Sequence, residues 1–130
     1  MACPYFDPQA PFSWTEWPNP PRMPLGDPYM GACAAAGRPA PDDLVRSCCN
    51  LGYARGKCPH FPAVEDGGDA ARFGIVELAG GTATIRYVIE RDHHPFADGT
   101  VTLAESTQPE GTLLARQARA HLDSYLRRNT

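Results

Sequence analysis

The chain has 130 residues, a net charge of −3 at pH 7 and a pI of about 5.7. This length fits one domain with a modest core, which we expect to span residues 1–130 as two halves, 1–64 and 70–130. The charge disfavours a general nucleic-acid binder, and no apolar run approaches the roughly 20 residues that cross a bilayer.

The N-terminal half is rich in proline and aromatic residues. Most of the 14 prolines lie between Pro4 and Pro62. Proline at this density excludes long helices and central strands, so this half is predicted to be irregular. Disordered segments are poor in aromatic residues. This half instead contains several, namely Tyr5, Phe6, Phe12, Trp14, Trp17 and Tyr29. We therefore expect an irregular arm that is anchored by aromatic side chains and cysteines.

One short helix is predicted within this arm. Pro41-Asp42-Asp43 supplies an initiating proline and acidic first-turn residues, and Gly52 can end the helix in the left-handed conformation. Cys48 and Cys49 lie near its end, about 100° apart around a helix axis. One of them is therefore expected to be a ligand and the other to pack in the core.

The second half shows strand patterns. Residues 73–78 and 82–91 are rich in β-branched side chains, and Ala79-Gly80-Gly81 between them predicts a hairpin turn. Asp98-Gly99 predicts another turn, before a strand over 100–104. Along the second strand Ala83, Ile85, Tyr87 and Ile89 share one face, which predicts a sheet covered on that side.

The last element is predicted to be a helix. Thr107-Gln108-Pro109-Glu110 has the pattern of a capping box. Apolar residues then recur at helical spacing, at Leu114, Ala118, Leu122 and Tyr125. Arg127 and Arg128 suit the helix C-terminus. The expected fold class is therefore α+β: an irregular Pro/Cys-rich N-terminal half with one short helix, then a three-stranded antiparallel sheet packed by a C-terminal helix.

All five cysteines lie within the first 58 residues, at Cys3, Cys33, Cys48, Cys49 and Cys58. The first residues lack the basic and apolar parts of a secretory signal, so we expect a cytoplasmic location. Stable disulfides are rare there, and cysteine clusters more often serve metals or catalysis. Two alternatives stay open: a disulfide framework, which the odd count fits poorly, and isolated buried thiols, Cys48 or Cys49 above all.

Four thiolates from separate segments can hold zinc, iron or a cubane cluster. Structural zinc sites use closely spaced pairs such as Cys-x-x-Cys, which this chain lacks. Proline follows Cys3 and Cys58, as it follows a cluster ligand in bacterial ferredoxins. We therefore predict a 4Fe-4S cluster, with Zn²⁺ as the alternative occupant. The predicted ligands are Cys3, Cys33, Cys49 and Cys58, with Cys48 as the substitute for Cys49.

The surrounding charges favour a negatively charged occupant. No acidic residue lies between residues 44 and 64, whereas Arg46, Arg55 and Lys57 do. Basic neighbours lower thiol pKa values and offset the charge of a thiolate-bound cluster. The alternative is that these basic residues form an ordinary solvated surface. His60 is an alternative fourth ligand if Cys3 is displaced.

The run Cys49-Asn50-Leu51-Gly52-Tyr53-Ala54-Arg55-Gly56-Lys57-Cys58-Pro59 resembles one in small, uncharacterised bacterial proteins. There it follows an N-terminal cysteine and precedes a strand-and-helix region similar to residues 73–128. The resemblance implies a bacterial origin and a common architecture. It implies no particular activity.

Other residues suggest chemistry less specifically. His93 and His94, beside Glu90 and Asp92, could serve acid–base catalysis or a metal, although adjacent strand residues point to opposite faces and a polar loop is the alternative. A nucleophilic thiolate at Cys49 or Cys58 is a further alternative, but no base can be identified.

The expected function is electron transfer or redox sensing by a cluster protein, with a redox or protein partner. Whether the protein is also an enzyme stays open, although an enzyme is not favoured. With zinc, the protein would instead be a structural, non-catalytic interaction module whose aromatic residues face the partner. We expect no membrane partner and no nucleic acid, because Trp14 and Trp17 have acidic or neutral surroundings.

Overall fold

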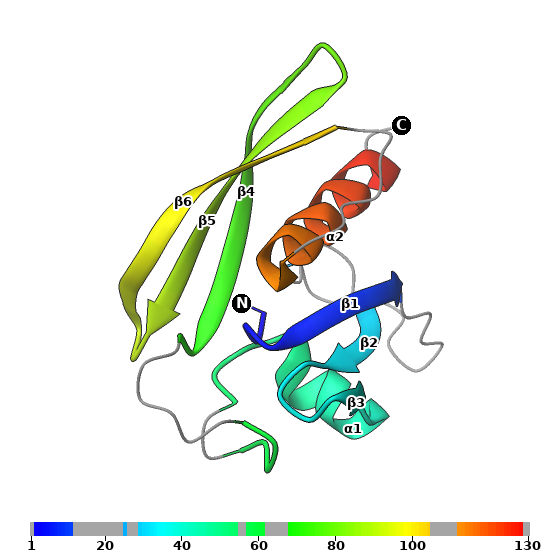
Figure 1. Cartoon of the computed structure of the whole chain (residues 1–130), viewed down its shortest axis with the longest axis vertical. Coiled ribbons are helices and arrows are strands. Elements are labelled where there is room, and N and C mark those ends of the chain that lie inside the picture. Colours follow the sequence, from blue (N-terminus) through cyan, green and yellow to red (C-terminus); the bar gives the residue numbers. More distant parts are fainter. Residues whose placement is uncertain are drawn as a thin grey trace.

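The computed structural model describes residues 2–11, 25, 29–54, 57–61, 68–104 and 112–128. Within these ranges the strands form two antiparallel sheets of three strands each, in the orders β1-β2-β3 and β4-β5-β6. Helix α2 (Leu113–Arg128) lies between the two sheets and contacts both (Figure 1). The N-terminal segment also joins them directly, because Ala2 pairs with Ala71 through two backbone hydrogen bonds of 2.7 Å.

The first sheet overturns the predicted fold class, because the N-terminal half is not irregular. It contains β1 (Phe6–Pro11), β2 (Tyr29–Cys33) and β3 (Arg38–Pro39). The prolines stand in the two edge strands: Pro8 and Pro11 in β1 and Pro39 in β3. An edge strand has one side without a partner, so it tolerates a residue that lacks an N–H donor. The central strand β2 contains no proline.

The predicted short helix is present, but most of it is not α-helical. Helix α1 (Asp42–Leu44) continues as a π-helical turn, η1 (Val45–Cys49). The amide of Asn50 donates to the carbonyl of Val45 at 3.4 Å, which is the i to i+5 pattern of a π-helix. Gly52 has φ 75°, which confirms the predicted left-handed residue after the helix.

The second sheet consists of β4 (Ala70–Ala79), β5 (Thr82–Arg91) and β6 (His94–Ala104). Gly80 and Gly81 have φ values of 61° and 77°, which confirms the predicted hairpin turn. The predicted turn at Asp98-Gly99 is wrong, because both residues lie inside β6. The chain reverses earlier, at Asp92 and His93, and both take positive φ values (51° and 65°).

Helix α2 begins after Thr112, whose hydroxyl oxygen accepts from the Ala115 amide at 3.1 Å, the bond of an N-cap. The predicted capping box at 107–110 lies outside the described residues, as do Phe12, Trp14 and Trp17 of the predicted arm. Ala118 and Leu122 pack against the second sheet as predicted.

The predicted position of Tyr125 in the buried stripe of α2 is wrong, because this side chain is 40 % exposed. The helix instead has a second buried face, which is turned toward the first sheet. Gln117, Ala120 and Ser124 lie on it at exposures of 1 %, 5 % and 0 %. Two of these three residues are polar, so an apolar stripe alone could not reveal this face. None of the described helices is long and apolar enough to cross a membrane.

Candidate cysteine site

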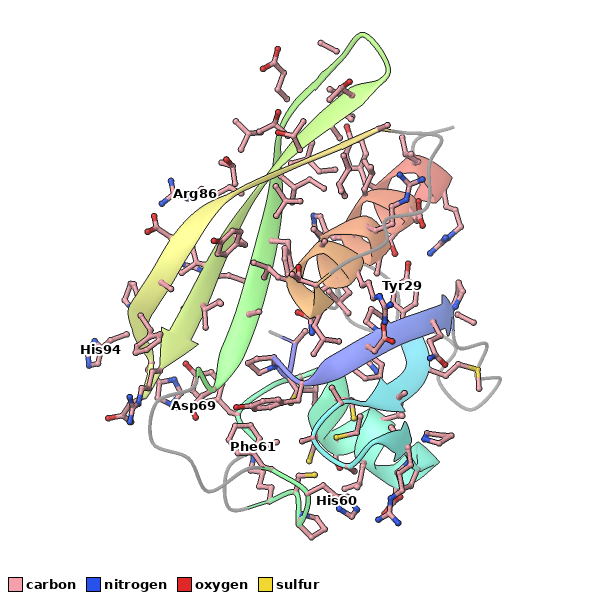
Figure 2. All side chains as sticks on the ribbon, viewed as in Figure 1. Tyr29, His60, Phe61, Asp69, Arg86 and His94 are labelled. Atoms are coloured by element: carbon pink, nitrogen blue, oxygen red, sulfur yellow. The ribbon has the colours of Figure 1, made fainter. Side chains whose placement is uncertain are left out.

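The structure brings all five cysteines to one cavity. They come from four places in the first half: Cys3 before β1, Cys33 at the end of β2, Cys48 and Cys49 in η1, and Cys58 in the turn 57–61. The remaining lining is apolar and aromatic apart from His60 and consists of Tyr5, Phe6, Ala35, Ala54, His60 and Phe61. Figure 2 shows sulfur atoms gathered beside the labelled Phe61 and His60.

The thiols differ in their access to solvent. Cys3, Cys48 and Cys49 are buried, at 8 %, 2 % and 7 % exposure, whereas Cys33 and Cys58 are half-buried. All five are free thiols. The cavity between them measures about 20 Å³, which is room for one water molecule. The cavity is therefore closed at the three buried cysteines and is most accessible to solvent at Cys33 and Cys58.

Backbone pairing fixes Cys3. Its amide donates to the carbonyl of Cys49 at 3.0 Å, so the N-terminal segment is held directly against η1. From the other side, the side-chain amide of Gln117 donates to the carbonyl oxygens of Cys3 and Phe6, each at 2.8 Å. Cys3 is thus positioned by two elements that are distant from it in the sequence, η1 and α2.

The π-helical turn places Cys48 and Cys49 on the same cavity. Both residues line the cavity, and the expectation that one of them is a ligand and the other packs in the core stays a prediction. Asn50, 1 % exposed, fixes the end of this turn: its side chain accepts from the Tyr29 amide at 2.9 Å and donates to the carbonyl oxygens of Tyr29 and Val45 at 2.9 and 3.0 Å. Asn50 thereby joins η1 to the strand that ends in Cys33.

The turn 57–61 carries Cys58 and lies across the cavity. Its backbone bonds are local, from the amides of Lys57 and Cys58 to the carbonyl of Ala54. Two side-chain contacts connect this turn to the first sheet and to the segment before β1. The rings of Phe61 and Tyr5 meet edge-on, with their centroids 5.5 Å apart. Arg38 Nη2, on β3, lies 3.0 Å from His60 Nε2. A guanidinium only donates, so this nitrogen of His60 accepts the hydrogen bond.

Burial raises the pKa of two thiols. The pKa of Cys3 rises from 9.0 to about 11, mainly through loss of solvent; a hydrogen bond from the Tyr5 backbone lowers it, and repulsion from ionised Cys33 and Cys58 raises it again. The pKa of Cys49 rises from 9.0 to about 12, again through burial first and then through repulsion from Cys3 and Cys33. Both thiols are therefore neutral at pH 7, and a metal that binds them must displace their protons.

Among the described residues, no group of three or more His, Cys, Asp or Glu side chains is placed so that it could hold a metal ion.

The other predicted chemistry lies elsewhere. His93 and His94 are exposed at the β5–β6 turn and do not line the cavity. The ring of His93 stacks on Tyr53 at 4.3 Å, and the Tyr53 hydroxyl donates to Glu90 at 2.7 Å. Arg55 and the side chain of Arg46, predicted to flank the cysteines, are not among the described parts, whereas Lys57 is described and exposed.

Sequence reasoning missed Asn50 and Gln117. Asn50 follows Cys49 directly, and its place in that distinctive run was the available signal. Gln117 gave no signal, because a glutamine beside an apolar helix stripe has the pattern of a solvent-facing residue. No protein-family model, no curated protein and no solved structure matches this chain.

Proposed function

We propose that the chain binds a 4Fe-4S cluster through Cys3, Cys33, Cys49 and Cys58 and uses it for one-electron transfer or redox sensing. The observation that carries this proposal is the convergence of all five cysteines on one cavity. Thiols that act only as small hydrophobic groups can be buried anywhere in a core. Here every thiol of the chain, from four separate segments, lies at the same place.

The positions of the cysteines in the sequence support a cluster over zinc, because the chain lacks the closely spaced Cys-x-x-Cys pairs of structural zinc sites. In a four-iron cube each thiolate binds a different corner, so the ligands can come from separate segments around one cavity, as these cysteines do.

The surroundings of Cys48 support the choice of Cys49 as ligand. Cys48 lies 3.5 Å from the hydroxyl of Ser47 on its own turn. The carbonyl oxygen of Cys49 accepts a hydrogen bond from the amide of Cys3, so the backbones of these two proposed ligands lie side by side. These contacts favour Cys49 over Cys48 as the fourth ligand.

Binding requires the cavity to widen, because 20 Å³ is too small for a cluster. The turn 57–61 can supply the movement, since its described contacts with the first sheet region are between side chains. Ala35 and Ala54 in the lining leave room for an occupant. Tyr5, Phe6 and Phe61 would then shield a cluster from water, and such burial is one of the factors that set its reduction potential.

The cytoplasm is the compartment that suits this proposal, because a reducing environment keeps thiols available as ligands. The test is anaerobic purification and reconstitution of the whole chain, followed by iron, sulfide and zinc analysis and an absorbance spectrum. We expect about four iron and four sulfide per chain and a brown protein. Stoichiometric zinc in a colourless protein, or no metal after reconstitution, would overturn the proposal.

A further inference from the structure

The cysteine cavity has one accessible side. Cys33 and Cys58 are half-buried, whereas the other three thiols are buried. Cys33 also lines a neighbouring groove of about 500 Å³, which continues along Arg38 and Arg116. Electron transfer is fastest across the thinnest layer of protein, so this side is the natural route to a cluster in the cavity.

The accessible side has a basic rim. Arg38, on β3, and Lys57, beside Cys58, are both exposed. Among the described residues, no acidic side chain lines the cavity, and the one acidic residue that lines the groove, Asp7, pairs with Arg116 at 2.8 Å. The positive charge of the rim comes from Arg38 and Lys57.

This local charge is opposite in sign to the charge of the whole protein. The net charge is −3, which at long range favours a basic partner. At physiological ionic strength, however, screening limits exposed charges to a range of about 8 Å, so the residues around the exposed thiols determine what docks there. Charge complementarity then favours an acidic partner at this rim.

We infer that the rim formed by Arg38 and Lys57, beside Cys33 and Cys58, is the docking surface for an acidic one-electron carrier protein. This inference rests on the proposed function. The step is the transfer of one electron from the reduced carrier, which is oxidised, to the oxidised cluster, which is reduced. No bond is made or broken and no proton is required.

The test uses a 2Fe-2S ferredoxin of strongly negative net charge as the probe. Its reduced form is mixed with the reconstituted protein in a stopped-flow instrument at low and high salt. We compare the wild type with Lys57→Glu and with Arg38→Glu/Lys57→Glu. Arg86→Glu is the matched control, because its side chain is 59 % exposed and it lies on β5, far from His60 (Figure 2).

We expect the second-order rate constant to fall about tenfold or more in the double variant and to lose its dependence on salt. Lys57→Glu alone should show part of this effect, and Arg86→Glu should change the rate less than about twofold. Equal rates in the wild type and the double variant, or an equal loss in Arg86→Glu, would overturn the inference.

Iron and sulfide are measured in each variant first, so failure of cluster binding is seen separately. A second readout does not need the cluster: the ferredoxin is added to isotope-labelled, metal-free protein, and backbone NMR shifts are followed. Shifts confined to residues 33–38 and 57–61 would support the docking surface even if the proposed function failed. Shifts centred on another part of the molecule would overturn it.

Discussion

The side chain of Gln117 fixes the backbone of Cys3, 114 positions earlier in the chain, through a hydrogen bond of 2.8 Å to its carbonyl oxygen. A second bond of the same length runs to the carbonyl of Phe6, and Gln117 is 1 % exposed. The buried polar face of α2 therefore positions the N-terminal end of the cysteine site.

Replacement of Gln117 by leucine should destabilise the protein. The change leaves two carbonyl oxygens without this donor in a buried place, which costs about 1–3 kcal/mol. The free energy of unfolding, measured by urea titration of the metal-free protein, should fall by that amount. Gln9→Leu is the control, because Gln9 is exposed on β1 and its loss should be nearly neutral. Equal stability of Gln117→Leu and wild type would show that these bonds are not important.

Single serine variants of the cysteines separate ligands from the fifth thiol. Cys58→Ser and Cys49→Ser should each lower the iron and sulfide content and the visible absorbance strongly, because serine is a poor replacement for a cluster thiolate. Cys48→Ser is the matched control and should keep its cluster. Retention of the cluster in Cys49→Ser combined with its loss in Cys48→Ser would exchange these two residues in the ligand set.

Alkylation of the metal-free protein should follow the exposure of the thiols. Cys33 and Cys58 are half-buried and should react first, whereas Cys3, Cys48 and Cys49 should react only after unfolding. Mass spectrometry after short treatment with a thiol reagent measures the order, and the unfolded protein should take up five labels. In the reconstituted protein we expect Cys33 and Cys58 to become protected as well. Rapid labelling of Cys3 would contradict the closed cavity.

Local patterns in the second half predicted its first hairpin, but not the extent of β6. Gly80 and Gly81 supply the positive φ values that a two-residue turn requires. In β5, Ala83 and Ile85 of the predicted inner face are buried, but the alternation does not continue to the end of the strand, where Glu90 of the opposite face is buried. The first sheet could not be predicted in this way. Its strands β1 and β2 pair across a long separation in sequence, and the prolines of β1 argue against a strand until its edge position is known.

The candidate site, like the fold, could be predicted from the sequence only in part. The grouping of the cysteines in the sequence indicated them as candidate ligands, and the structure places all five at one cavity. Cys48 and Cys49 both line this cavity and lie in a π-helical turn, which a single-sequence pattern does not reveal. The role of Asn50 depends on its contacts with β2, which is far from it in the sequence.

Gly31 should be irreplaceable at the junction of β1 and β2. A Cβ atom at this position would overlap the carbonyl group of Asp7 across the sheet. Gly31→Ala must therefore push the two strands apart, at a cost of about 1–3 kcal/mol in unfolding free energy. Gly74→Ala in β4 is the matched control, because no atom lies within 4 Å of its added Cβ. Urea unfolding should show a loss for Gly31→Ala and little change or a small gain for Gly74→Ala; similar results for the two variants would contradict the pairing of β1 with β2.

Tyr53 should make stability depend on alkaline pH. Its pKa is raised from 10.0 to about 12, first by burial and then by the hydrogen bond that its hydroxyl donates to Glu90. The unfolded chain has the ordinary pKa, so between pH 10 and pH 12 it releases this proton while the folded protein keeps it. The stabilisation by Tyr53 is therefore complete below pH 10 and is lost as the pH rises toward 12.

The comparison of wild type with Tyr53→Phe isolates this effect from the titration of the thiols. At neutral pH the variant should be less stable by about 1 kcal/mol, because Glu90 loses a hydrogen-bond donor. The difference between the two proteins in urea unfolding should stay constant up to pH 10 and then shrink as the pH approaches 12. A difference that is constant across this range, or that grows with pH, would show that the folded protein does not raise the pKa of the Tyr53 hydroxyl.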